Sequence, residues 1–264
     1  MKNMMRRATV ALGAVLLLAG PAHSAADWAS DPVMTGENCE NLEWLEIGTF
    51  LERYYYSGLA YGDSSDASGA RMMQHYAVAS ALINRSQVCL AEALELKSLA
   101  DELREQQALL TGGTSLSKRQ MKQKRKLTDE ANAEIEEAAE ALETLTPEQR
   151  DRFQKGSAAY MAGTYATGKL YQAVEGVVGS SVDSLQEETS SKSRFGLNRV
   201  KRLAGKAKNV FQEGSQMSVV FRGLKDHTAS LYKTSQFLNE YGKQRELDLP
   251  EDATGQLGEV DDWI

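Results

Sequence analysis

The sequence predicts an all-α protein, a disulfide-stapled helical bundle with a long antiparallel coiled-coil-like hairpin. Between residues 38 and 241 almost every segment repeats its apolar side chains with the helical period. No run of alternating β-branched residues lasts long enough to indicate a strand. Two cysteines, Cys39 and Cys89, supply the third observation, because they lie in segments expected to be neighbouring helices.

Residues 1–26 have the three zones of a cleaved signal peptide. A basic start is followed by an apolar run over residues 8–19 and by small residues up to Ala26, with cleavage expected after Ser24 or Ala26. The apolar run is shorter than the roughly 20 residues that span a bilayer. We therefore expect an exported, periplasmic mature chain without a transmembrane segment.

The charge balance excludes a class of partner. The chain carries 30 Lys plus Arg and 37 Asp plus Glu, a formal net charge of −7. Removing the three basic residues of the leader takes the mature chain to −10. A non-specific nucleic-acid binder needs the opposite balance, so no nucleic acid is expected as a partner.

Cys39 and Cys89 are expected to form a disulfide. Two cysteines in an oxidising compartment most simply pair, and antiparallel helices bring these positions within about one helical turn. Closing a loop of about fifty residues stabilises a fold by roughly 4 kcal/mol in the chain-entropy model. A redox-active thiol pair is the weaker alternative, because the chain lacks the Cys-x-x-Cys spacing.

The bundle is expected to occupy residues 27–246. Its first helix should run from about residue 39 to 57, with Asn38 as N-cap and Leu45 on the buried side. A second helix, without internal proline, should be continuous from about residue 67 to 110.

A helical hairpin is predicted over residues 90–145. Leu96, Leu99, Leu103, Gln106 and Leu110 step by three and four residues, the spacing of a coiled-coil seam. After a turn at residues 111–114, a helix from about 117 to 145 should fold back antiparallel.

The fourth helix should begin at Pro147. Thr146 and Gln149 flank this proline as a capping box, and the small residues that follow should let a neighbouring helix come close. We expect this helix to break at residues 176–181 and further helices at 195–212 and 216–241. The acidic tail, residues 247–264, is expected to be disordered.

No catalytic or metal-binding motif is present, so we expect neither an enzyme nor a cofactor or metal site. The sequence lacks a nucleophile elbow and the His-Glu-x-x-His pattern. His75 and His227 are both expected to be packed residues of helices. Residues 163–170 resemble a phosphate-binding loop, but Leu170 replaces the magnesium-binding hydroxyl and no strand precedes them.

Two sets of residues are candidates for binding a partner. One is the acidic tail's Trp263, an apolar anchor. The other is a basic run near the hairpin turn, which is either a solvated, partly paired face or a surface for an anionic membrane or an acidic envelope protein. The run consists of Lys118, Arg119, Lys122, Lys124, Arg125 and Lys126.

Tyrosines near the first helix raise a second possibility. Tyr54, Tyr55, Tyr56 and Tyr76 would either pack at a helix end or line a pocket for a ligand. The sequence thus favours a non-enzymatic periplasmic interaction or adaptor protein contacting an envelope protein or membrane surface. The alternative is a periplasmic carrier that holds a small hydrophobic or lipid-like ligand between helices.

Overall fold

The computed structural model describes residues 27–37, 39–56, 65–112, 118–190 and 223–264, and its described elements are all helical, as predicted. Side chains are described in these ranges except at residues 65–70, 118 and 175–190. The elements are η1 (Asp27–Ser30), α1 (Pro32–Thr35), α2 (Trp44–Tyr54), α3 (Ser65–Ala93), α4 (Lys97–Thr111), α5 (Lys118–Ala141), α6 (Pro147–Ser190), α9 (Leu224–Gln244) and α10 (Glu251–Asp261). No described helix has the length and apolar character needed to cross a membrane.

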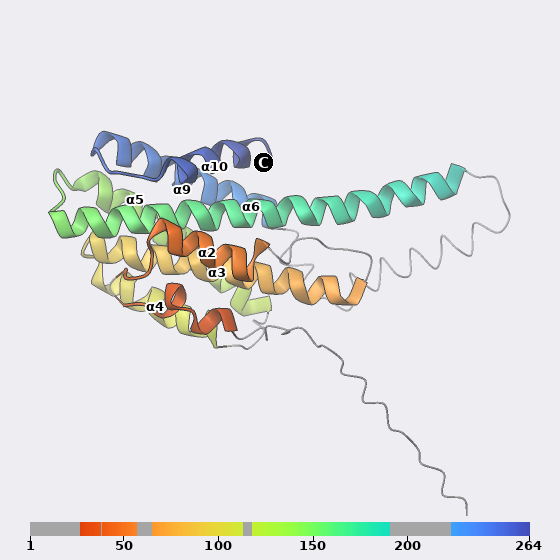
Figure 1. The fold of residues 1–264 in the computed structure, drawn as a ribbon, viewed down its shortest axis with the longest axis horizontal. Coiled ribbons are helices and arrows are strands. Elements are labelled where there is room, and N and C mark those ends of the chain that lie inside the picture. Colours follow the sequence, from red (N-terminus) through yellow and green to blue (C-terminus); the bar gives the residue numbers. More distant parts are fainter. Residues whose placement is uncertain (1–26, 38, 57–64, 113–117, 191–222) are drawn as a thin grey trace, which may run out of the picture.

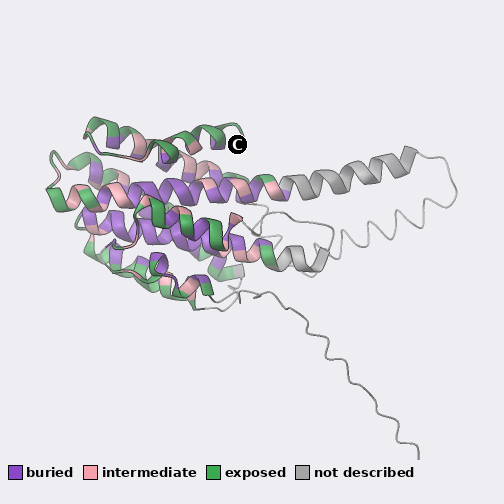
Figure 2. Ribbon diagram, in the orientation of Figure 1, coloured by how far each residue is buried: buried purple, intermediate pink, exposed green. Residues whose placement is uncertain are grey.

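The bundle is built around the pair α3 and α6, which form the most extensive helix contact of the described chain. In Figure 1, α6 runs the length of the bundle with α2 and α3 on one side and α9 and α10 on the other. Figure 2 shows buried residues concentrated along α3 and α6, with exposed residues on the outer helices. The fourth predicted helix is therefore central, as its small residues suggest.

The capping box that begins α6 is present as predicted. The Gln149 N–H donates to Thr146 Oγ1 at 3.2 Å, and the Thr146 N–H donates to Gln149 Oε1 at 2.9 Å. This reciprocal pair satisfies amides that the first turn of a helix cannot bond internally. The helix then continues through residues 176–181 to Ser190, so the predicted break there is wrong.

Two glycines of α6 allow α3 to lie close. A Cβ atom at Gly156 would meet Leu90 at 2.9 Å, and one at Gly163 would meet Ile83 at 2.8 Å. Since real Cβ atoms essentially never come that close, α3 and α6 approach each other at a distance that only glycine permits. The segment resembling a phosphate-binding loop is thus a packing face inside a helix.

The predicted disulfide is present, with 5.4 Å between the Cα atoms of Cys39 and Cys89. Cys39 itself does not begin a helix. It has φ of 64° in a turn, and α2 begins only at Trp44. Leu45 falls on the outer face of α2, opposite the buried Ile47, Phe50 and Leu51, and is 80% exposed, contrary to expectation.

The predicted continuous helix over residues 67–110 is wrong, because the chain turns between Ala93 and Lys97. Glu95 has φ of 60°, and the Leu96 N–H donates to the Ala91 carbonyl at 2.8 Å. These are the features of a Schellman helix terminus, with glutamate at the position that glycine usually occupies. Through this turn α4 packs against α3.

The two arms of the predicted hairpin exist as α4 and α5. Leu99 and Leu103 of the predicted seam are buried in the main core cluster with Ala131 and Ile135 of α5. Because the principal contact of α4 is with α3, the long antiparallel hairpin over residues 90–145 stays a prediction.

The expectation of a disordered tail is wrong. A second Schellman-type turn, with φ of 54° at Glu246, reverses the chain after α9, and Arg150 donates to the Glu246 carbonyl at 2.6 Å. Helix α10 follows and packs against α6 and α9 through Leu257 and Val260. The predicted helix over residues 216–241 corresponds to α9, whereas the one over 195–212 lies outside the described residues.

We predict that one substitution has opposite effects at two glycines. Gly163→Ala should lower the free energy of unfolding by about 1 kcal/mol, since overpacking against Ile83 outweighs the gain in helix propensity. Gly258→Ala in α10, where no atom lies within 4 Å of the added Cβ, should raise it by about 0.5–1 kcal/mol. Chemical denaturation measures both. Equal shifts of the same sign would contradict the close approach of α3 and α6.

The disulfide leads to a second prediction. The double variant Cys39→Ser, Cys89→Ser should lose roughly 4 kcal/mol of unfolding free energy, because the open chain gains conformational entropy when it unfolds. Urea titrations with and without a reductant measure the effect. The reductant should destabilise the wild type and leave the double variant unchanged. If the reductant left the unfolding free energy of the wild type unchanged, the prediction would be wrong.

Candidate functional site

A groove lies between α4 and α5, at the end of the molecule where the sequence places the basic run. Its volume is about 180 Å³. Leu109 lies at its edge and is 56% exposed, one of two large apolar side chains so exposed in the described chain. We call this the α4–α5 groove; its lining residues are Glu102, Glu105, Gln106, Leu109, Leu110, Gln120, Gln123, Lys124 and Leu127.

The basic run does not form one surface. Arg119 and Lys122 are exposed and make no ion pair with the described residues, whereas Lys126 pairs with Glu130 at 2.7 Å. Arg125 is half-buried beside Gly223, and the side chain of Lys118 is outside the described set. Among the side chains of the run that the structure describes, Arg119 and Lys122 are therefore the ones that offer uncompensated charge to a partner.

Lys124 corrects the predicted partner surface, because it is buried. Its Nζ atom lies 5.2 Å from the ring centroid of Tyr76 and has no hydrogen-bond partner in the part of the chain that the structure describes. Burial lowers the pKa of Lys124, although the Tyr76 hydroxyl opposes that shift. Burial alone would raise the pKa of Tyr76, but the charges of Lys124 and Arg125 outweigh it and lower that pKa. Lys124 thus forms part of the groove wall and offers no exposed charge to a partner.

The tyrosines form packing contacts. Tyr55 is fully buried, and its hydroxyl donates to the Ala166 carbonyl of α6. Tyr76 is also buried, Tyr54 packs on Phe50 with ring centroids 5.3 Å apart, and Tyr56 lies 6.5 Å from Tyr165. Tyr55 and Tyr76 leave no open wall for a ligand, so the structure favours the packing alternative for this set.

The Trp263 side chain already packs against residues of α6 in the same chain. Its ring lies over Gly168 of α6, with the Lys169 ammonium 4.6 Å from the ring centroid and Tyr165 5.5 Å away. Lys169 also pairs with Glu259 at 3.3 Å, which ties α10 to α6. A partner would have to displace these contacts, so the expectation of a free anchor at Trp263 is corrected.

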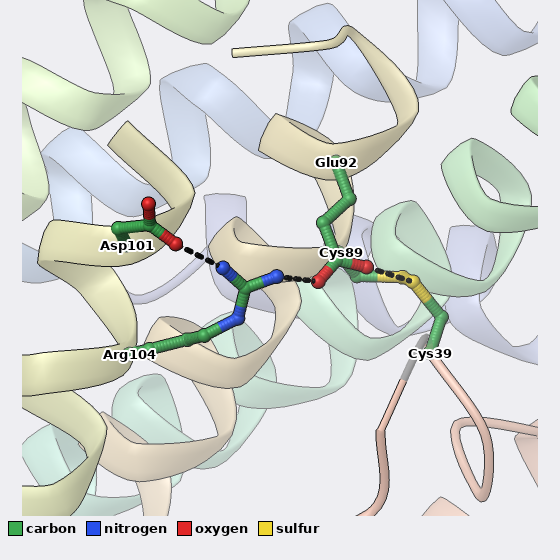
Figure 3. A network of polar contacts seen from close by, with 5 residues as sticks. All are labelled: Cys39, Cys89, Glu92, Asp101 and Arg104. Carbon is green, nitrogen blue, oxygen red and sulfur yellow. Dashed lines mark hydrogen bonds and ion pairs between the residues drawn. A yellow bond between two sulfur atoms is a disulfide. The ribbon is translucent and has the colours of Figure 1, made fainter. Parts of the chain in front are cut away.

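A polar cluster next to the disulfide was missed in the sequence (Figure 3). Glu92 forms an ion pair with Arg104, whose guanidinium also binds Asp101. The other carboxylate oxygen of Glu92 lies 3.7 Å from Cys39 Sγ. Arg85, seven residues before Glu92 on α3, is 5% exposed, and its Nε and Nη2 atoms have no hydrogen-bond partner among the described residues. The residues of this cluster come together because the chain turns at Glu95 and α4 folds back along α3. No linear motif in the sequence therefore predicts the cluster.

The described residues contain no cluster of three or more His, Cys, Asp or Glu side chains that could hold a metal ion. Searches against protein-family models, curated proteins and solved structures return no match for this chain. The function must therefore be inferred from the surfaces of the chain itself.

His75 gives a prediction about pH. Burial, with a smaller contribution from Arg71, lowers the pKa of His75 to about 4. Below its unfolded pKa of 6.5 the unfolded chain binds a proton that the folded chain does not. The free energy of unfolding should therefore fall as pH drops from 6.5 towards 4.

Urea titrations at pH 7 and pH 5 measure this effect. Between these values His75 should account for a loss of at most about 2 kcal/mol, which His75→Gln should abolish. His227, whose pKa is also lowered by burial, remains in both proteins, so the comparison isolates His75. Identical pH slopes would mean that His75 is not held neutral by the fold.

Proposed function

We propose that this protein is a non-enzymatic interaction protein of the bacterial periplasm, which binds an envelope protein at the α4–α5 groove. The observation that supports it is an exposed apolar side chain, Leu109, beside the groove between α4 and α5, while the cations Arg119 and Lys122 are exposed on other faces of α5. Interfaces of this kind combine an apolar centre with a charged rim. The form of residues 1–26 and the disulfide between Cys39 and Cys89 both agree with an oxidising compartment.

The charges of the groove favour a protein over a membrane. Glu102 and Glu105 of α4 line the groove, and the exposed Arg119 and Lys122 belong to α5, the helix that forms its other side. An anionic lipid surface would meet both signs at once, and its attraction to the cations would be offset. A partner helix with an apolar side chain and charges of both signs can match them individually.

The interior of the groove suits such an apolar side chain. Leu110 and Leu127 form part of its wall, and Gln106 contributes an amide whose nitrogen and oxygen have no hydrogen-bond partner among the described residues. A partner's backbone or polar side chain would satisfy that amide on binding, which adds a directional contact to the apolar one.

Site-specific photocrosslinking in the native host tests the proposal. A photoreactive residue in place of Gln123, an exposed residue of the groove wall, should capture a discrete protein, whereas one in place of Lys233, an exposed lysine of α9, should not. Capture at both positions would indicate non-specific contact, and capture at Lys233 alone would overturn the assignment.

Variants then measure the contribution of the groove to the affinity for the captured protein. Leu109→Ser should weaken binding by about 30-fold, as for a central interface residue, because it removes the apolar anchor. Lys122→Glu should slow association, whereas the matched variant Lys233→Glu should leave it unchanged. Thermal unfolding should be close to wild type for all three. Unchanged affinity of Leu109→Ser would exclude the groove.

A further inference from the structure

A second cleft, of about 510 Å³, lies on the other side of α4 and contains a buried, unpaired arginine. The C-terminal end of α1 and the helices α3 and α4 surround it. Its wall includes Met34, Arg85, Val88, Glu92, Arg104 and Gln107. This volume falls within the range of small-molecule sites in proteins. We call it the Arg85 cleft.

The Arg85 guanidinium has hydrogen-bond donors without acceptors. Arg85 is 5% exposed, and none of the described residues accepts a hydrogen bond from its Nε or Nη2. These two nitrogens form one edge of the guanidinium, the fork that matches the two oxygens of a carboxylate. A buried charge with unmet hydrogen bonds is costly, and burial lowers the pKa of Arg85 accordingly.

The nearby carboxylates do not relieve this cost. Glu92 attracts Arg85 across the cleft, but one of its oxygens is bound by Arg104 and the other faces the disulfide (Figure 3). Arg104 in turn is held between Glu92 and Asp101. The network thus supplies acceptors to the Arg104 guanidinium. It leaves the Nε and Nη2 atoms of Arg85 without an acceptor among the described residues.

We propose that the Arg85 cleft binds a small organic carboxylate, whose oxygens accept hydrogen bonds from the Arg85 guanidinium. The Nε and Nη2 atoms lie beneath the cleft surface, so a rotation about the last torsions of the side chain brings that edge to the ligand. Met34 and Val88 offer apolar contact for the carbon skeleton of the ligand. This site is separate from the α4–α5 groove, and neither proposal depends on the other.

The charge of the cleft selects a monoanion. Glu37 and Glu92 line the same wall as Arg85 and Arg104, so the formal charges of these four residues cancel. A dianionic phosphate would be repelled by the two glutamates, whereas a carboxylate with one negative charge replaces the missing acceptor of Arg85.

The arginine Nε–H signals in nitrogen-edited NMR spectra of the mature, disulfide-bonded protein test the proposal. Acetate, L-lactate and L-alanine are the probes, with inorganic phosphate at matched ionic strength as the comparison. At least one carboxylate at millimolar concentration should shift the Arg85 signal in a saturable manner, with phosphate weaker. No shift with any of the three, or a stronger effect of phosphate, would overturn the proposal.

Two variants separate binding from folding. Arg85→Met should raise the thermal midpoint of the ligand-free protein, because it removes an unpaired buried charge, and should weaken carboxylate binding by about tenfold or more. The matched variant Arg119→Met, on the exposed face of α5, should bind carboxylate as the wild type does. A carboxylate-induced rise in the midpoint that persists in Arg85→Met would place the ligand elsewhere.

Discussion

The close approach of α3 and α6 is the contact on which the rest of the structure depends. Gly156 and Gly163 leave room for Leu90 and Ile83, so the two helices meet almost backbone to backbone. The other elements cover the faces that remain: α4 packs on α3, while α9 and α10 pack on α6. The Cys39–Cys89 disulfide then fastens the N-terminal segment to α3. The two candidate sites, the α4–α5 groove and the Arg85 cleft, lie on helix faces that this packing leaves uncovered.

Local signals with a direct physical cause were readable in the sequence. The capping box at Thr146 and Gln149, the disulfide and the glycine-rich face of α6 all follow from a few neighbouring residues or from simple pairing. The two turns that decide the topology were not readable, because Glu95 and Glu246 occupy the left-handed positions where glycine is the usual signal. The break before α4 was missed for this reason, whereas the ordered helix α10 was missed because the acidic composition of residues 247–264 is typical of a disordered tail.

The candidate site was predicted only in part. The basic run was found as a sequence feature, but its charges were treated as one face, although Lys124 lies in register with the buried Met121 and Thr128. That spacing of three and four residues was visible in the sequence and marks a position on the inner side of α5. Arg85 could not be found in this way, because its isolation arises from where α4 returns along α3. Which arginine is paired depends on the tertiary structure and cannot be read from a local residue pattern.

The separation of α3 and α6 along the chain has a consequence for the order of folding. Ile83 and Gly163, which touch in the core, are about 80 residues apart, whereas α3 and α4 are joined by a single tight turn. Closing the longer loop costs more chain entropy, so we expect local pairing of α3 with α4 to precede docking of α6. During that interval the apolar face of α3 is uncovered, and the nascent molecule is at its most vulnerable to self-association or to capture by a chaperone.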